Sequence, residues 1–324
     1  MFQYCIVVRM SKKKFDLEAY SDSEDKVDVV YKPDEDIILQ KEVSEAIGMP
    51  GLRKGTMSVA YGLSNSGKTN LMIQAAVQAQ RQGVVPILII TENKMDWTHA
   101  QNQGLDISKS AAIIREDLEY LEDVYNYISQ KIEDVKTGKL PYDVLFLWDS
   151  VASTPSVESM EISKDGSIKK RYGPQKNASV IGYYNPIIMK RLTATRREDS
   201  KGTATLLALT QAYVKPAEFA GGIATIVPNG GEKIWFPLSM CIEVKEGKRL
   251  QATVNGNKVV FGTVCKLKVV KNHLSDLSSS GEYVITGSGI IPNDPKAIED
   301  YKKQHRDSWV STYIPYENGE LPND

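Results

Sequence analysis

A scarcity of cysteine and the absence of long hydrophobic runs limit what this chain of 324 residues can be. Cys5, Cys241 and Cys265 are too few and too far apart for a disulfide framework, and they lack the paired spacing of a zinc site. The apolar N-terminal stretch ends after a few residues at Arg9 and has no small-residue cleavage site. We therefore expect a cytoplasmic protein with reduced cysteines and no association with a membrane.

The chain also lacks a strong net charge, because 40 basic and 41 acidic side chains give a formal charge of −1. The charges are unevenly distributed. Residues 1–36 carry nine acidic and six basic side chains, and residues 315–324 carry three acidic side chains and no basic one. The rest of the chain has 34 basic and 29 acidic side chains. This mild positive surplus permits contacts with a phosphate backbone without demonstrating them.

Hydrophobic residues (41%) and charged residues (25%) occur in the proportions of a folded soluble protein. From Thr56 onward, short apolar runs alternate with stretches of helical periodicity. The runs lack polar alternation, which is typical of strands buried on both faces. This pattern predicts an α/β fold with a mainly parallel central sheet flanked by helices. The expected strands are residues 56–61, 86–91, 143–148 and 205–210, and the expected helices are residues 69–82 and 118–136.

After Gly231 the pattern changes to that of antiparallel strands, which would extend the sheet. Asn255 and Gly256 form the expected two-residue hairpin turn within this portion. The expected organisation has three parts: a flexible acidic arm at residues 1–36, a core at residues 37–275 and a short C-terminal extension at residues 276–324.

Residues 62–69, with the sequence GLSNSGKT, match the phosphate-binding loop pattern between an expected strand and an expected helix. A glycine-rich turn that merely starts a helix is the alternative, and the strand–loop–helix context favours the phosphate site. Backbone N–H groups would face the phosphates, Lys68 would add a positive charge, and Thr69 would hold Mg²⁺ through its hydroxyl. The residues expected to bind ATP here are Gly62, Leu63, Ser64, Asn65, Ser66, Gly67, Lys68, Thr69 and Asn70.

Two acids end neighbouring expected strands. Asp149 follows the run of residues 143–148 and would lie beside Thr69 near the metal, although an acid in this position is also a common turn cap. Glu92 follows the run of residues 86–91, where it could orient or deprotonate a water, and a solvated loop acid is the alternative. Because Ser150 offers no carboxylate next to Asp149, Glu92 is the better candidate for the base. Asp96 and His99 are expected to contact adenine.

Gln211 ends the run of residues 205–210 and can bond a phosphate oxygen or a water through its amide. The segment that follows, residues 212–229, has two glycines and two prolines, no clear period, and a length too great for an ordinary connection. We expect this long loop beside a ligand site to have a function.

The motif GLSNSGKT, Glu92, the stretch LFLWDSVAS, Gln211 and the pair Gly230-Gly231 together resemble the RecA family, which includes the bacterial recombinase and phage UvsX-type proteins. The resemblance covers about residues 47–273. It implies a RecA-like ATPase core that uses ATP and Mg²⁺. It also implies that Glu92 and Lys68 act in ATP hydrolysis, and that Gln211 couples ATP to DNA binding.

The resemblance further implies two DNA-binding loops, at about residues 155–182 and 212–229. Both mix cations with aromatic or apolar side chains, a combination that grips phosphates and stacks or separates bases. A solvated charge run is the alternative for Lys169, Lys170 and Arg171. The residues expected to bind DNA are Lys164, Lys169, Lys170, Arg171, Tyr213, Lys215 and Phe219.

Filaments of this family place ATP between subunits, and Lys271 matches a lysine that reaches the neighbouring subunit's phosphates. Trp235 and His273 stand near positions where further cations are common, although Lys233 lies two residues before Trp235.

The implied partners are single-stranded DNA, homologous duplex DNA, further copies of the chain, a single-strand-binding protein and a loader. The compact core resembles phage or archaeal versions, so a phage-encoded recombinase in the host cytoplasm is one expectation. Two alternatives stay open: a RecA-fold hexameric helicase and a regulatory recombinase paralogue.

Overall fold

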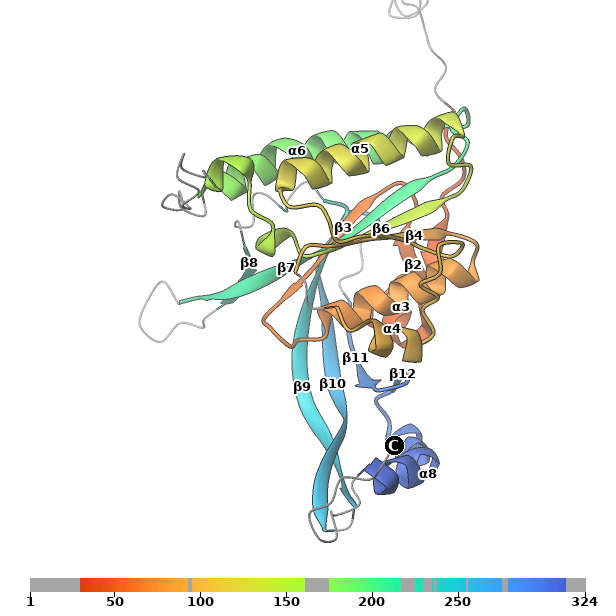
Figure 1. The fold of residues 1–324 in the computed structure, drawn as a ribbon, viewed down its shortest axis with the longest axis vertical. Coiled ribbons are helices and arrows are strands. Elements are labelled where there is room, and N and C mark those ends of the chain that lie inside the picture. Colours follow the sequence, from red (N-terminus) through yellow and green to blue (C-terminus); the bar gives the residue numbers. More distant parts are fainter. Residues whose placement is uncertain are drawn as a thin grey trace, which may run out of the picture.

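The computed structural model describes residues 30–92, 95–160, 175–216, 225–229, 235, 238–254, 256–275 and 279–312. These residues form a central sheet of ten strands with helices on both faces (Figure 1). Its strand order is β12-β11-β10-β9-β3-β7-β6-β4-β5, with β8 paired to β7. The strands are β3 (Met57–Gly62), β4 (Val85–Ile90), β5 (Ile113–Arg115), β6 (Val144–Asp149), β7 (Ala204–Lys215), β8 (Thr225–Pro228), β9 (Met240–Val254), β10 (Asn257–Asn272), β11 (Ser280–Thr286) and β12 (Gly289–Pro292).

The middle of the sheet is parallel. β3 pairs in parallel with β7 and β9, and β6 pairs in parallel with β7 and β4. The pairs of β9 with β10, β10 with β11 and β11 with β12 are antiparallel. The predicted α/β fold, with a mainly parallel sheet extended by antiparallel strands, is therefore confirmed.

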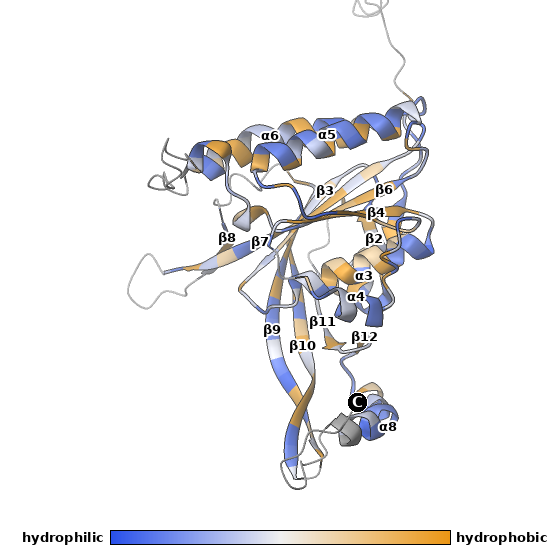
Figure 2. Ribbon diagram, viewed as in Figure 1, coloured by the Kyte–Doolittle hydropathy of each residue, from blue (hydrophilic) through white to orange (hydrophobic). Residues whose placement is uncertain are grey.

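Both faces of the parallel strands are buried, which explains their continuous apolar sequences. On β6, Leu145 and Leu147 pack into the core cluster on one face, whereas Phe146 and Trp148 pack into the cluster on the other. The central strands and α3 are mostly hydrophobic in Figure 2. The helices are α2 (Lys41–Ile47), α3 (Lys68–Arg81), α4 (Trp97–Asn102), α5 (Leu121–Thr137), α6 (Gln175–Ala194) and α8 (Pro295–Thr312), with short 3-10 helices η1 (Val151–Ser153) and η2 (Val157–Ser159).

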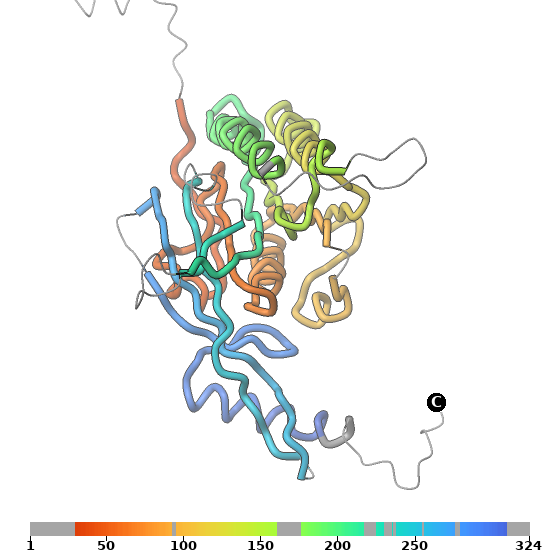
Figure 3. The backbone as a smooth tube through the Cα atoms, turned by 90° about the vertical axis from the view of Figure 1, so that its left-hand side faces the viewer, coloured from red at the N-terminus to blue at the C-terminus, as the bar shows by residue number. Residues whose placement is uncertain are grey.

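Helices α5 and α6 lie side by side on one face of the sheet, opposite α3 (Figures 1 and 3). An aromatic cluster joins α5 and α6 to each other and to the sheet. Tyr125 of α5 stacks on Tyr184 of α6 with ring centroids 4.8 Å apart, and its edge meets Trp148 of β6 at 5.3 Å. The buried Tyr125 hydroxyl donates to Asn185 of α6 at 2.8 Å, so its polar end is satisfied.

Strands β9 and β10 form a long hairpin that projects from the body as an arm (Figure 3). β9 ends at Val254 and β10 begins at Asn257, as the predicted two-residue turn requires, and Gly256 has a φ of 82°. Helix α8 packs against this arm through Phe261, whose ring centroid lies 5.2 Å from that of Trp309.

Ordered elements lie beyond both limits of the expected core. Past residue 275, β11 and β12 continue the sheet and α8 follows them. At the other end, the two-stranded sheet of β1 (Asp36–Ile38) and β2 (Gly51–Arg53) places Asp36 in ordered structure, and Tyr31 bridges to Arg197. Residues 1–29 of the predicted arm lie outside the described residues. In the described part of the chain, none of the helices is both long and apolar enough to span a membrane.

Candidate functional site

The loop of residues 62–69 connects β3 to α3, as the sequence predicted, and its glycines are required by close packing. A side chain on Gly62 would place Cβ 2.1 Å from the carbonyl oxygen of Val244. Gly67 has a φ of 98° and caps the N-terminus of α3, and Asn65 also has a positive φ of 62°. Glycine adopts such conformations without steric cost. The loop can therefore turn tightly and direct backbone N–H groups outward at the start of α3.

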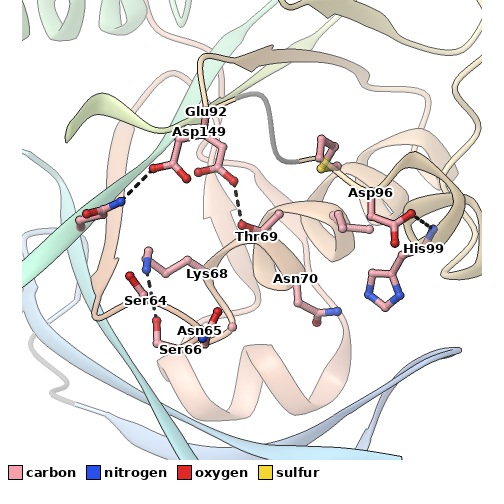
Figure 4. A pocket seen from close by; sticks show the side chains of 14 residues that line it. Ser64, Asn65, Ser66, Lys68, Thr69, Asn70, Glu92, Asp96, His99 and Asp149 are labelled. Atoms are coloured by element: carbon pink, nitrogen blue, oxygen red, sulfur yellow. Dashed lines mark hydrogen bonds between the residues drawn. The ribbon is translucent and has the colours of Figure 1, made fainter. Parts of the chain in front are cut away.

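A cavity of about 500 Å³ lies over this loop at the carboxyl ends of the parallel strands (Figure 4). It brings together most of the side chains expected to bind nucleotide or to act on it. Its lining residues are Ser64, Asn65, Ser66, Gly67, Lys68, Thr69, Asn70, Ile73, Glu92, Met95, Asp96, His99, Asp149 and Gln211.

Lys68 is held by the loop itself. Its Nζ donates to the carbonyl oxygens of Gly62 at 3.0 Å and Leu63 at 2.8 Å. Burial lowers the pKa of the ammonium, and the nearby carboxylates of Asp149 and Glu92 oppose that shift. The remaining contact of Nζ is with Oγ of Ser66 at 3.4 Å, and a buried cation whose donors meet only neutral groups gains from an anion brought into the cavity. Lys68 is thus placed to meet a phosphate group.

Thr69 and Asp149, the two residues predicted to hold Mg²⁺, are in direct contact. The Thr69 hydroxyl donates to Oδ2 of Asp149 at 2.8 Å, joining the first turn of α3 to the end of β6. Burial raises the pKa of Asp149, Glu92 adds to the rise, and the Thr69 bond and the Lys68 charge oppose it. A hydroxyl and a carboxylate oxygen are ligands that suit Mg²⁺, so these two residues fit the expected metal.

Glu92 lies in the loop after β4 and shares the cavity with Asp149 (Figure 4). Its Oε1 accepts hydrogen bonds from Oγ of Ser150 at 2.7 Å and from Nε2 of Gln211 at 3.1 Å. The ends of β4, β6 and β7, where the sequence placed Glu92, Asp149 and Gln211, therefore meet at one cavity. Ser150, however, was passed over in the sequence because it has no carboxylate. Its position directly after Asp149, beside the end of the neighbouring strand, was the available signal.

Asp96 and His99 line the cavity from the start of α4. Oδ1 of Asp96 accepts the backbone N–H of His99 at 2.9 Å, so the carboxylate caps the helix. Asn70 donates to Oε1 of Gln103 at 2.9 Å, which ties α3 to α4. The predicted contact of Asp96 and His99 with adenine stays a prediction, and Gln103 is a buried connecting residue that the sequence did not indicate.

Comparison with known proteins agrees with this geometry. The sequence model of the RecA N-terminal domain family matches residues 39–290, well over half of the chain. The chain belongs to the RecA family. It is 27% identical over 233 residues to Protein RecA of Mesoplasma florum, covering 72% of this chain and 62% of that protein. It is 28% identical over 247 residues to Protein RecA of Thermotoga neapolitana, covering 76% of this chain and 62% of that protein. The chain thus spans less than two thirds of the curated relatives' length.

Lys271 does not line the cavity of this RecA-family chain. It pairs in register with Cys241 on β9, and Cys241 pairs with Val59 near the start of β3. Lys271 therefore lies at the level of the middle of β3 and not at the end from which the phosphate-binding loop leaves, and burial lowers the pKa of its ammonium. The expected contact with the ATP of a neighbouring subunit stays a prediction.

Trp235 belongs to the core and takes no part in the cavity. Its indole is buried and donates from Nε1 to the carbonyl oxygen of Asn229 at 2.8 Å. Lys233, the alternative cation, lies outside the described residues. The structure therefore explains why an aromatic residue suits position 235 but does not test the substitute.

The described ends of the two expected DNA-binding loops belong to regular secondary structure. Residues 175–182 belong to α6, and residues 225–228 form β8, which pairs antiparallel with the end of β7. Pro228 ends β8 opposite Ala212, so the prolines and glycines of this segment did not exclude strand pairing. Tyr213 and Lys215 lie on β7 and are exposed. Lys164, Lys169, Lys170, Arg171 and Phe219 lie outside the described residues.

Proposed function

We propose that this RecA-family chain is an ATP-dependent DNA recombinase. In this proposal it forms filaments on single-stranded DNA, promotes pairing with homologous duplex DNA and strand exchange, and hydrolyses ATP in a DNA-stimulated reaction. The observation that carries the proposal is the placement of Gln211 and Tyr213 on one strand. Gln211 contacts Glu92 in the cavity, and two residues further along β7 Tyr213 is 46% exposed on the β7–β8 hairpin.

Nucleotide binding follows from the loop and its surroundings. The triphosphate would take the place above the start of α3, where N–H groups and the helix N-terminus attract anions. Lys68 would exchange its carbonyl partners for phosphate oxygens. Thr69 and Asp149 would hold Mg²⁺, which when bound neutralises phosphate charge. The fit of ATP with Mg²⁺ is supported by the cavity volume of about 500 Å³ and by this set of donors.

Hydrolysis would be directed by Glu92. The oxygen of a water attacks the γ-phosphorus, the bond to the β–γ bridging oxygen breaks, and ADP leaves. Glu92 orients the water and accepts its proton, which then passes to solvent or phosphate. The hydrogen bond from Ser150 would keep Glu92 in place for this step also when the Gln211 amide turns to the phosphate.

ATP binding would be coupled to DNA binding through β7. Gln211 can bond either Glu92, as in this structure, or a γ-phosphate oxygen, since an amide both donates and accepts. A shift of its amide toward the phosphate would reposition the following residues, including Tyr213 and Lys215. ATP binding would therefore change the hairpin that meets the DNA. Lys271 of one subunit would reach the ATP of the next, which makes assembly part of the proposal.

The test is ATP hydrolysis with and without single-stranded DNA, combined with negative-stain imaging of the same samples. The proposal expects DNA-stimulated hydrolysis and helical filaments in the presence of ATP. Closed rings would instead support a hexameric helicase, and nucleotide binding without turnover would support a regulatory paralogue. A single-strand-binding protein and a loader are the further partners that we expect to affect the rate of filament formation.

A further inference from the structure

Ser150 lies between the proposed metal-binding acid and the proposed catalytic glutamate. Its side chain is buried, and its hydroxyl donates to Oε1 of Glu92 at 2.7 Å. The bond from Gln211 to the same oxygen is longer, at 3.1 Å. A hydroxyl bonded to an ionised carboxylate at this length is among the stronger hydrogen bonds in proteins. Ser150 is therefore the closer of the two side chains that hold Oε1 of Glu92.

A second hydroxyl, that of Ser153, contacts the Ser150 hydroxyl. Oγ of Ser153 is 3.1 Å from Oγ of Ser150, and it donates to the carbonyl oxygen of Ser150 at 2.9 Å. A hydroxyl carries a single hydrogen. While Ser153 donates to the carbonyl, its own oxygen competes with Glu92 for the hydrogen of Ser150. If Ser153 turned to donate to Oγ of Ser150 instead, it would polarise that hydroxyl and strengthen its bond to Glu92.

The backbone of Ser150 is fixed to the end of β4, whereas Ser153 belongs to the turn that leads away from β6. Thr154 donates to the carbonyl oxygen of Ser150 at 2.8 Å, and Thr91 donates to it at 3.1 Å. Ser153 lies on η1 and is exposed. Further along, Ser156 donates from its hydroxyl to Asn177 of α6 at 2.8 Å. The Ser153 hydroxyl can thus rotate about its own side chain while Thr91 and Thr154 hold the backbone of Ser150 in place.

We propose that Ser150 is a positioning residue for Glu92, and that Ser153 sets the direction of the Ser150 hydroxyl, so that the turn after β6 adjusts the glutamate. The inference rests on the proposed role of Glu92 in ATP hydrolysis. Ser150 keeps its proton throughout, since its effect is exerted through one hydrogen bond. This connection runs on the β6 side of the glutamate, separately from the connection through Gln211 and β7.

The first test is Ser150→Ala in the full chain, with hydrolysis measured at saturating Mg²⁺·ATP and single-stranded DNA. Loss of one hydrogen bond to a charged group is expected to lower kcat by about tenfold or more. KM should change by less than about twofold, because no contact with the substrate is removed. The matched control is Ser200→Ala, which deletes another buried hydroxyl, one that donates to the carbonyl oxygen of Gly202 between α6 and β7 and does not reach Glu92. The control should keep the wild-type rate.

The second test uses Ser153→Ala, which a folded protein tolerates because the side chain is exposed. In the observed arrangement, this change removes the Ser153 oxygen that competes with Glu92 for the hydrogen of Ser150. In the alternative arrangement, it removes the Ser153 donor that would polarise the Ser150 hydroxyl. The ratio of the DNA-stimulated rate to the DNA-free rate should therefore fall by roughly threefold. An unchanged ratio would overturn the role of Ser153.

A double-mutant cycle separates positioning from a structural role. In a Glu92→Gln background, Ser150→Ala should lower kcat no further, because the group that it positions has lost its function. A full tenfold loss in both backgrounds would overturn the proposal, as would a wild-type kcat for Ser150→Ala alone. If Glu92→Gln itself hydrolyses ATP at the wild-type rate, the role of Glu92 fails, and that result is obtained without any change at Ser150.

Discussion

Gln211 donates a hydrogen bond from Nε2 to Oε1 of Glu92 at 3.1 Å and so joins the end of β7 to the loop after β4. The two residues are far apart in the sequence, and they meet because the parallel strands end at one edge of the sheet. Beyond Gln211, β7 continues into a hairpin with β8. The contact therefore links the cavity to an exposed element through a single strand.

Replacing Gln211 by alanine is expected to remove the link between the nucleotide cavity and the exposed end of β7. ATP should still bind, because residues 62–69 supply most of the expected phosphate contacts and Gln211 adds a single hydrogen bond. The increase in affinity for single-stranded DNA on adding ATP should be lost, as should the stimulation of hydrolysis by DNA. Fluorescence anisotropy of a labelled oligonucleotide, with and without ATP, measures the first effect. Gln251→Ala, which deletes an exposed amide on the β9–β10 hairpin, is the control and should behave as wild type.

Replacing Glu92 by glutamine should separate binding from turnover. The variant keeps its shape and can still accept hydrogen bonds, so ATP and DNA should bind as before. A positioned general base contributes about 10²–10⁴-fold, and kcat should fall within that range. Steady-state hydrolysis and equilibrium nucleotide binding are measured on the same sample. Glu119→Gln changes an exposed glutamate outside the cavity and should have no effect. Unchanged turnover in Glu92→Gln would remove this residue from the mechanism.

Asp149 gives the site a pH dependence. Its pKa is raised by burial above that of the unfolded chain, so the free protein binds the proton more tightly when folded. This contribution to stability is present at low pH and is lost as pH rises through the raised pKa. Mg²⁺ requires the ionised carboxylate, and its affinity should therefore fall as pH is lowered toward that pKa.

Asp149→Asn should accordingly raise the melting temperature of the free protein at neutral pH, because a buried charge is removed. It should also abolish most of the stabilisation by Mg²⁺·ATP, which for a ligand at about a hundredfold excess over Kd amounts to roughly 2.7 kcal/mol. Thermal unfolding with and without Mg²⁺·ATP measures both effects. A variant that is destabilised when free, yet fully stabilised by Mg²⁺·ATP, would contradict the assignment.

Lys169, Lys170 and Arg171 are predicted from the sequence to contact phosphates. Neutralising all three should weaken binding to single-stranded DNA and reduce the slope of log K against log salt by about 2, since each contact contributes roughly 0.7. The matched control neutralises three cations of α8 instead: Lys302, Lys303 and Arg306. An equal loss in both variants would show an effect of net charge rather than of the predicted loop.

Much of the fold could be predicted from the sequence because its strands are buried on both faces. The run from Val144 to Asp149 is apolar until its last residue, and that residue ends the strand in the structure. The phosphate-binding loop was recognisable because Gly62 and Gly67 meet backbone and packing requirements that few other residues satisfy. These signals are local, and a single sequence contains them in full.

The parts that escaped prediction depend on tertiary pairing. Strand β8 forms because Ile226 and Val227 find partners on β7, and nothing local in a segment rich in glycine and proline indicates that pairing. Helix α8 is secured by rings that lie far away in the sequence, such as Phe261. Ser150 became a candidate only when its hydroxyl was seen 2.7 Å from Glu92, because that distance depends on two strands meeting.

The most direct test of the account is the affinity of the purified protein for single-stranded DNA with no nucleotide, with ADP and with a slowly hydrolysed ATP analogue. The account predicts tight binding only with the triphosphate, and loss of that dependence in Lys68→Ala. Equal affinity in all three nucleotide states would contradict the claim that a triphosphate at residues 62–69 controls the affinity for single-stranded DNA.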